Sequence, residues 1–222
     1  MESLAKLYDN IPEKLKQKSG SVFYSGKSAF SGTKKVYILG LNPGGKDKDH
    51  KQYTIEKQIQ EVIDQGDDSW SAYFDKNWNT GDKNTPFQNR IQKLFNALNF
   101  NASEVPASNI CFVRSKDEKS IKPFLKKYVD QCWPFHQAVI ETLSIQMIIC
   151  LGKTTGNFVR NKLDATEYIG YYEEQNNRKW KTELYKNKEG LIVVSATHPS
   201  RADWTKANSS PIPKIVEVYN KL

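Results

Sequence analysis

A short apolar run that ends in a polar, glycine-rich turn is the feature that most constrains how this chain can fold. Residues 36–41 read VYILGL and residues 42–45 read NPGG. Such a run is typical of a strand buried on both faces of a parallel sheet. Pro43 disfavours the α region for Asn42, and Gly44 lets a ligand approach the backbone without a Cβ in the way. The run therefore predicts a buried strand that delivers the Asn42 amide at its carboxyl end.

Three further apolar runs have the length and composition of buried strands, namely Asn109–Val113, Ile145–Leu151 and Leu191–Ala196. Helical patterns separate these runs, so the strands are joined by crossovers and run parallel. Residues 166–189 alternate instead around Asn176 and Asn177, which suits an antiparallel excursion. We therefore expect an α/β fold: a three-layer α/β/α sandwich with a central, mostly parallel four-stranded sheet.

Five stretches have the residue pattern of a helix. A single domain over residues 1–222 can contain all of them. The apolar stripe that follows Pro86 is the strongest of these patterns, and Pro134 marks a kink or a break in the longest one. Residues 1–33 are expected to form a helical lead-in, over 2–18, and a loop. The predicted helices are 54–65, 86–99, 120–143, 152–163 and 211–222.

The composition indicates the cellular compartment of the protein and the charge of its partner. The chain has 33 Lys and Arg against 25 Asp and Glu, with a pI of about 9.2, which favours a polyanionic partner. Its three cysteines, Cys111, Cys132 and Cys150, lie in or beside apolar runs and suggest buried thiols in a reducing interior. No apolar run has the length of a membrane span, and the N-terminus has no signal-peptide core. We expect a cytoplasmic, monomeric protein that does not enter a membrane.

A second polar turn follows the last predicted strand. Residues 197–200 read THPS, so His198 adds an imidazole to the edge of the sheet that carries Asn42. A lone histidine is more often structural than catalytic, and Asn-Pro-Gly is an ordinary turn sequence. Two such turns, far apart in sequence and at the same edge of the sheet, favour a functional site.

With these turns the chain resembles the uracil-DNA glycosylase superfamily. Gly40–Gly44 matches its Gly-x-Asp/Asn-Pro-x loop after the first strand, and His198–Ser200 matches its His-Pro-Ser loop after the last. In the thermostable branch of that superfamily, a Pro-Phe pair opens a helix as Pro86 and Phe87 do here. An Asn-led strand recognises uracil there, in the place of Asn109–Val113.

The resemblance implies a role for each matched residue. Asn42 and His198 would be catalytic: the amide positions a water, and the imidazole donates a hydrogen bond to uracil O2 as charge develops. Phe87 would stack on the base. The Asn109 amide would donate to uracil O4 and accept from uracil N3–H, whereas cytosine has a donor in place of the first group and an acceptor in place of the second. The other expected substrate-binding residues are Gly40, Leu41, Pro43 and Gly44, and the expected DNA-binding residues are Ser200, Arg201, Trp204 and Lys46.

The chain also departs from the superfamily in three places. It lacks the four cysteines that hold an iron-sulfur cluster in the thermostable branch, so we expect no metal and no organic cofactor. Gly44 stands where the most active branch has a Tyr that excludes thymine, which suggests tolerance of a 5-substituent. Arg201 and Ala202 replace the usual Pro and Leu wedge. Arg201 or Trp204 would then have to fill the vacated stack, or the substrate is single-stranded.

These observations predict a monofunctional DNA glycosylase of base excision repair, which hydrolyses the N-glycosidic bond of uracil or a related damaged pyrimidine. The alternative is a catalytically weak or inactive member of the same fold that binds nucleic acid or a free base. A third possibility is an α/β protein that processes a nucleotide or small metabolite. Cleavage assays separate the first from the other two.

Overall fold

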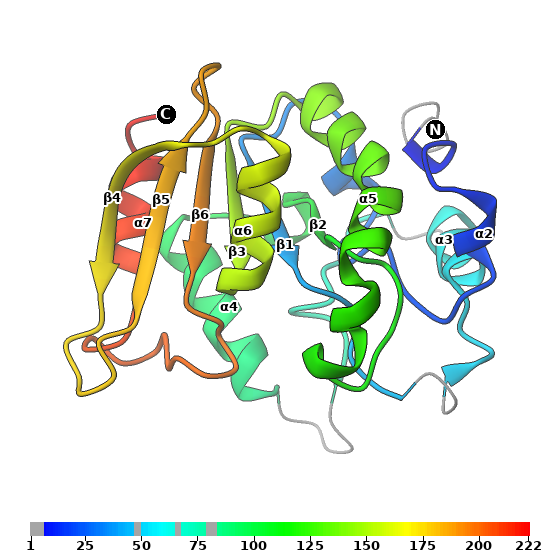
Figure 1. Cartoon of the computed structure of the whole chain (residues 1–222), viewed down its shortest axis with the longest axis horizontal. Helices are drawn as coiled ribbons and strands as arrows, with labels where there is room; N and C mark the ends of the chain where they lie inside the picture. Colours follow the sequence, from blue (N-terminus) through cyan, green and yellow to red (C-terminus); the bar gives the residue numbers. More distant parts are fainter. Residues whose placement is uncertain (1–6, 47–49, 65–67, 79–83) are drawn as a thin grey trace.

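The computed structural model describes residues 7–46, 50–64, 68–78 and 84–222. Its centre is a six-stranded sheet with the order β2-β1-β3-β6-β5-β4 (Figure 1). The first four strands in this order are parallel, and β5 and β4 continue the sheet antiparallel. The strands are β1 (Val36–Gly40), β2 (Ala107–Asn109), β3 (Met147–Leu151), β4 (Glu167–Glu173), β5 (Lys181–Lys186) and β6 (Ile192–Ala196).

The predicted α/β fold and its four parallel strands are confirmed. The sheet has six strands rather than four because the predicted antiparallel excursion does not leave it: β5 pairs with β6, and β4 pairs with β5. This hairpin extends the sheet beyond β6 and turns back toward the ends of the parallel strands (Figure 1). Its tip is therefore free to contribute to the same edge of the sheet.

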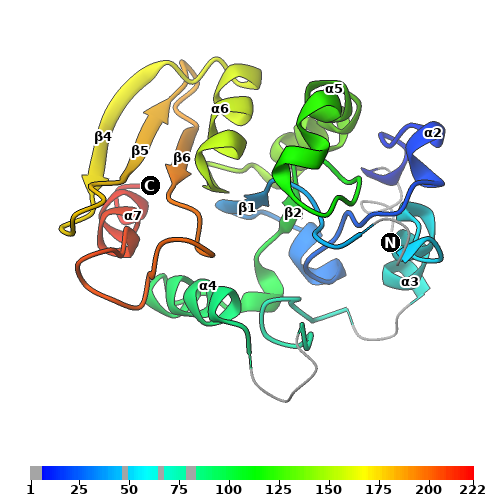
Figure 2. The same ribbon diagram turned by 60° about the horizontal axis from the view of Figure 1, so that its bottom comes forward.

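Helices cover both faces of the sheet and give the three layers (Figure 2). α5 (Glu118–Leu143) and α6 (Lys153–Lys162) pack on one face, and α4 (Pro86–Ala97) and α7 (Ile212–Tyr219) pack on the other. The short helices α2 (Glu13–Lys16) and α3 (Ile55–Asp64) extend the α5 side. The 3-10 turns η1 (Lys27–Phe30) and η3 (Ala102–Glu104) complete the described elements.

The strand sequences explain why two cores form. Along β1, Tyr37 and Leu39 belong to the core beneath α5, while Val36 and Ile38 belong to the core above α4 and α7. Successive side chains of a strand point to opposite faces, so a strand buried on both faces must be apolar throughout. All five residues of β1 are buried, as the sequence predicted.

The second strand ends where it was predicted to begin. Residues 110–113 are not part of β2, although the backbone N–H groups of Ile110 and Cys111 still donate to the carbonyls of Gly40 (2.9 Å) and Leu41 (3.0 Å). The Phe112 carbonyl instead accepts a bond from the N–H of Ser21 (3.0 Å). The apolar residues here are buried because the chain passes beneath α5, and Asn109 becomes the last residue of its strand.

The helix predictions differ from the structure in two places. α5 continues through Pro123 and Pro134, so of the kink or break expected at Pro134, the break does not occur. The lead-in is not one continuous helix: Leu7 and Tyr8 are helical, residues 9–12 are not, and α2 then covers Glu13–Lys16; residues 1–6 lie outside the described part. No helix in the described ranges is long and apolar enough to cross a membrane.

Candidate active site

A cleft of about 1190 Å³ opens at the carboxyl ends of the four parallel strands. Ligands of open α/β sheets bind at this edge. Asn42 reaches the cleft from the turn after β1, Asn109 from the end of β2, Gly152 from the turn after β3 and His198 from the turn after β6. The structure therefore brings together the polar turns that the sequence placed on one edge.

The Asn42 side chain is oriented by its own amide nitrogen. Nδ2 faces three acceptors, the carbonyls of Pro43 (2.9 Å) and Val113 (3.2 Å) and the hydroxyl oxygen of Ser115 (2.9 Å). An amide can satisfy these acceptors only with its nitrogen on this side. The carbonyl oxygen Oδ1 has no hydrogen-bond partner in the described part of the chain, so it is free to accept a hydrogen from water.

The turn after β1 is also held through its backbone. The Ser115 N–H donates to the Pro43 carbonyl (3.1 Å), and the Arg114 guanidinium donates to the Gly44 carbonyl. Gly44 and Ser115 are paired as an isolated parallel bridge. A Cβ at Gly44 would meet no heavy atom within 4 Å, so this part of the cleft floor is open.

Asn109 is a buried amide that the protein itself leaves incompletely paired. The residue is 6% exposed, and Nδ2 forms no hydrogen bond of standard geometry among the described residues, although the Tyr24 hydroxyl lies close to the Asn109 side chain. Oδ1 lies against β1, where a Cβ at Gly40 would approach it to 2.2 Å. Buried polar groups without a partner cost free energy. A buried amide in the wall of a cleft therefore indicates a ligand that pairs with it.

The tautomer of His198 follows from its neighbour. The backbone N–H of Ser200 lies 3.1 Å from Nδ1, and the Ser200 hydroxyl lies 2.7 Å from the same atom. A backbone N–H can only donate, so Nδ1 is the acceptor and the proton of the neutral ring is on Nε2. Burial lowers the pKa of His198, the Arg201 charge lowers it further, and Glu118 opposes the shift. The cleft thus contains a neutral imidazole whose Nε2–H has no hydrogen-bond acceptor in the part of the chain that the structure describes.

The turn that carries His198 is anchored from two sides. The Arg90 guanidinium, on α4, donates to the Pro199 carbonyl (2.5 Å) and pairs with Asp203 (3.2 Å). From the β4–β5 hairpin, the Arg178 guanidinium donates to the Arg201 carbonyl (2.7 Å). These bonds join the turn to helices and strands on either side of the cleft, and so hold the imidazole in place.

Aromatic rings form one wall of the cleft. The Phe87 ring lies 5.6 Å from His198, 5.8 Å from Trp78 and 6.1 Å from Tyr73, measured between ring centres. Tyr24 lines the same cleft, and its pKa is raised by burial, an effect that the Asn109 side chain and Arg114 oppose. Of these rings, the sequence predicted Phe87 and His198 as site residues and did not predict the other three.

The remaining predicted residues lie at the margins of the site. Gly40 and Leu41 line the cleft, Pro43 is buried in the turn, and Lys46 is exposed beside it. Ser200 and Arg201 are exposed at the cleft mouth.

Trp204 requires a correction. It is 0% exposed and packs in the core with α4 and α7, so the prediction that its indole contacts DNA is wrong. The turn after His198 directs both Ala202 and Trp204 inward.

Other cleft residues had no local sequence signal. The Glu118 carboxylate, in the first turn of α5, accepts a bond from the Thr154 hydroxyl (2.6 Å), in the first turn of α6. Trp180, just before β5, also lines the cleft. These side chains meet only because the sheet topology brings their elements to the same edge.

The cysteines are buried free thiols, as predicted. Burial raises the pKa of Cys132, which also contacts Cys111, and burial raises the pKa of Cys150. No group of three or more His, Cys, Asp or Glu side chains able to hold a metal occurs in the part of the chain that the structure describes.

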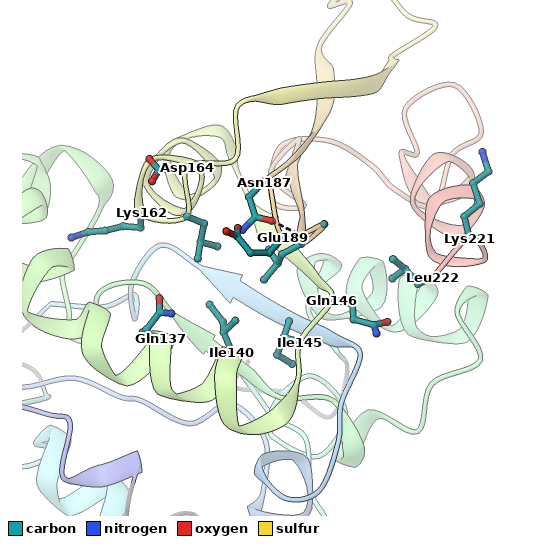
Figure 3. A pocket seen from close by; sticks show the side chains of 13 residues that line it. Gln137, Ile140, Ile145, Gln146, Lys162, Asp164, Asn187, Glu189, Lys221 and Leu222 are labelled. Carbon is teal, nitrogen blue, oxygen red and sulfur yellow. Dashed lines mark hydrogen bonds between the residues drawn. The ribbon is translucent and has the colours of Figure 1, made fainter.

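A second cavity, of about 650 Å³, lies at the opposite edge of the sheet (Figure 3). It is bordered by Gln146, just before β3, by Asn187 and Glu189, between β5 and β6, and by the end of α6 at Lys162. The Asn187 carboxamide oxygen is already used, because it accepts a bond from the Leu191 N–H (2.8 Å). The convergent polar turns are all in the first cleft.

A comparison with known protein families gives one match. The model described as the uracil DNA glycosylase superfamily matches residues 28–221. No curated protein matches the chain. The matched range includes both polar turns, Phe87 and Asn109, and leaves out Tyr24.

Proposed function

Because it matches the family model over most of its length, the chain belongs to the uracil DNA glycosylase superfamily, and we propose that it is a monofunctional glycosylase that releases uracil or a related damaged pyrimidine from DNA. Membership supports a DNA-glycosylase type of activity in general. The observation that carries the specific proposal is the buried Asn109 amide, whose Nδ2 is left without a hydrogen bond of standard geometry by the described residues and which lines the same cleft as the His198 N–H donor.

Base recognition is assigned to Asn109. Its amide offers a donor to O4 and an acceptor to N3–H of a uracil ring, and cytosine presents the opposite groups at both positions. Cytosine would leave two polar pairs unmade in a dry part of the cleft, at about 1–3 kcal/mol for each unsatisfied group. Sites built to hydrogen-bond a substrate discriminate strongly in this way. Phe87 would provide the stacking surface beside the base.

Stabilisation of the departing base is assigned to His198. Cleavage of the N-glycosidic bond leaves negative charge on the pyrimidine, spread onto O2 and O4. A neutral Nε2–H, held by Ser200 behind it, is a preorganised donor for that charge. The lowered pKa of the ring keeps it neutral at physiological pH.

Water activation is assigned to Asn42. With Nδ2 committed to three acceptors, Oδ1 can accept one hydrogen of a water and so orient its oxygen toward C1′. An amide is a very weak proton acceptor, so this group orients the water rather than deprotonating it. We therefore expect slower turnover than a carboxylate at this position would give.

The chemistry requires the target base to leave the helix and enter the cleft. Ser200 and Arg201 are exposed residues that line the cleft, and Lys46 is exposed two residues after Gly44; all three would contact the DNA backbone. The overall positive charge of the chain favours such a partner. The open floor at Gly44 supports acceptance of 5-substituted uracils as well.

One observation favours a second function, binding without cleavage. Asn42 is an amide, and none of its bonded partners in the described structure is an ionisable side chain. Such a cleft could hold a uracil base and not hydrolyse it.

An excision assay distinguishes the two functions. Oligonucleotides with a single uracil, 5-hydroxymethyluracil or hypoxanthine, in single strands and duplexes, would be incubated with enzyme in excess and tested for free base and abasic sites. We expect uracil release, with losses of about a hundredfold or more in Asn42→Ala and His198→Ala. Asn157→Ala, on the exposed side of α6, is the matched control. Tight binding of the uracil strand with no base released would favour the second function.

A further inference from the structure

The hairpin between β4 and β5 brings an exposed indole to the active-site cleft. Trp180 lines the cleft together with Thr197, His198 and Arg201, and the residue is 37% exposed. The strands of this hairpin are antiparallel additions to the sheet, and their turn lies beside the loop that follows β6 (Figure 1). An aromatic ring of this size at a cleft mouth is available to a ligand.

The indole is held in place from behind. The Arg178 guanidinium carbon lies 4.4 Å from the centre of the Trp180 ring, in cation–π geometry. Arg178 is itself fixed by Glu174, whose side chain is fully buried, at 2.9 Å, and by the Arg201 carbonyl at 2.7 Å. One face of the indole is therefore covered by a guanidinium that also holds the His198 turn.

The turn after His198 offers no alternative ring on this side of the cleft. Ala202 and Trp204 are both 0% exposed, and Ser200 is small. Arg201 is exposed but presents a flexible cation. Trp78 also lines the cleft and is equally exposed, at 37%, but its ring packs against Phe87, with 5.8 Å between the ring centres. Trp180 is instead linked to the His198 turn through Arg178.

We propose that Trp180 stacks on an unpaired nucleobase next to the nucleotide that enters the cleft. The proposal rests on the proposed function, because an extruded base leaves its neighbours without a stacking partner. Every base has a π-face, so an indole can replace the missing neighbour regardless of sequence. The stacked base is the neighbour of the target in a single strand, or the orphaned base opposite it in a duplex.

The charges around the indole suit this occupant. Lys153 and Arg201 line the cleft, and Lys179 precedes Trp180 directly; all three are exposed, and none forms an ion pair in the described ranges. Unpaired cations beside a stacking ring are typical of surfaces that bind single-stranded nucleic acid. The phosphates on either side of the stacked base would lie within reach of these side chains.

A fluorescence measurement tests the proposal without requiring cleavage. A 2′-fluoro-uridine blocks hydrolysis, and 2-aminopurine is placed next to it in a single strand or opposite it in a duplex. We expect binding to quench the 2-aminopurine in at least one of these positions. Trp180→Ala should abolish that quenching and weaken binding by roughly ten- to a hundredfold. Trp180→Phe should restore part of both effects.

The matched control is Tyr171→Ala, on the same hairpin, which is 49% exposed and is not a cleft residue. It should bind and quench like the parent protein. Quenching next to the uridine identifies the neighbouring base, and quenching opposite it identifies the orphaned base. A folded Trp180→Ala protein that binds and quenches like the parent would overturn the proposal, as would a parent protein that binds without quenching. Trp180-dependent quenching in a protein that releases no uracil would contradict the proposed glycosylase activity and support the stacking role of Trp180.

Discussion

At the scale of single residues, the candidate site depends on a few groups whose hydrogen bonds leave one atom free. Asn42 commits its amide nitrogen and keeps Oδ1, and His198 commits Nδ1 and keeps Nε2–H. Asn109 keeps its amide nitrogen without a partner in the described structure. These free atoms are one acceptor and two donors, and all three residues line the same cleft. The set can orient a water, pair with a base and stabilise an anion.

The His198 tautomer can be measured directly. We expect the imidazole nitrogen chemical shifts to show a neutral ring with its proton on Nε2 at pH 7. Because burial and Arg201 lower its pKa, the ring should take up its second proton only below its ordinary value of about 6.5. A titration midpoint above 6.5, or a proton on Nδ1 at pH 7, would contradict the assignment.

Gly40 is predicted to control the placement of Asn109. In Gly40→Ala the new Cβ would lie 2.2 Å from Asn109 Oδ1, so the amide must move. A displacement of this size should lower the rate of uracil release by about a hundredfold. Comparing single-turnover rates in Gly40→Ala, Asn109→Ala and the double variant measures the coupling. Fully additive losses would show that Gly40 does not act through Asn109.

At the scale of elements, the sequence predicted the helices and strands that have a clear residue pattern within their own segment. β1, β3 and β6 are continuous apolar runs, and α4 has a Thr85 cap, a Pro at its start and a clear apolar stripe. β2 was misplaced because residues 110–113 are buried by packing beneath α5, which composition does not distinguish from a strand. Trp180 was missed and Trp204 misassigned for a related reason. Which of two tryptophans faces the cleft is decided by the path of the hairpin and of the β6 turn, and neither path has a local signal.

The packing of α6 on β6 gives an element-scale prediction. A Cβ at Gly156 would lie 2.2 Å from Ser195 Oγ and 2.9 Å from its Cα. Alanine favours a helix by about 1 kcal/mol over glycine, but the clash with backbone must displace the helix. We expect Gly156→Ala to lower the free energy of unfolding by about 1–3 kcal/mol. Asn157→Ala, one residue along and exposed, should be neutral or slightly stabilising in the same denaturant titration. Equal stability of the two variants would contradict this close packing.

At the scale of the whole molecule, one sheet joins the site to the core. The four parallel strands deliver their turns to one end of the sheet, and α5 packs on one face of that sheet. Within this core His136 is fully buried, and the Tyr37 hydroxyl lies 2.9 Å from its Nδ1. Burial lowers the pKa of His136 to about 3. The stability of the fold is therefore coupled to pH through a residue far from solvent.

The sign of that coupling follows from the two states. The unfolded chain protonates His136 near pH 6.5, whereas the folded chain does so only near pH 3, so acid favours unfolding between these values. This residue should reduce the free energy of unfolding by about 1.4 kcal/mol per pH unit across that window and have no pH effect above it. The free energy of unfolding would be measured against pH for the parent protein and for His136→Gln. The difference between the two profiles separates the contribution of His136 from that of the carboxylates. Identical pH profiles for the two proteins would contradict the prediction.

The release of uracil from DNA is the most direct test of the central claim. A uracil-containing single strand and duplex, with enzyme in excess, would be assayed for free base in a single turnover for the parent protein, Asn42→Ala and His198→Ala. The account predicts free uracil and an abasic strand from the parent, with both variants slower by about a hundredfold or more and still able to bind the DNA. No base released by a folded parent protein, or undiminished release by either variant, would contradict it.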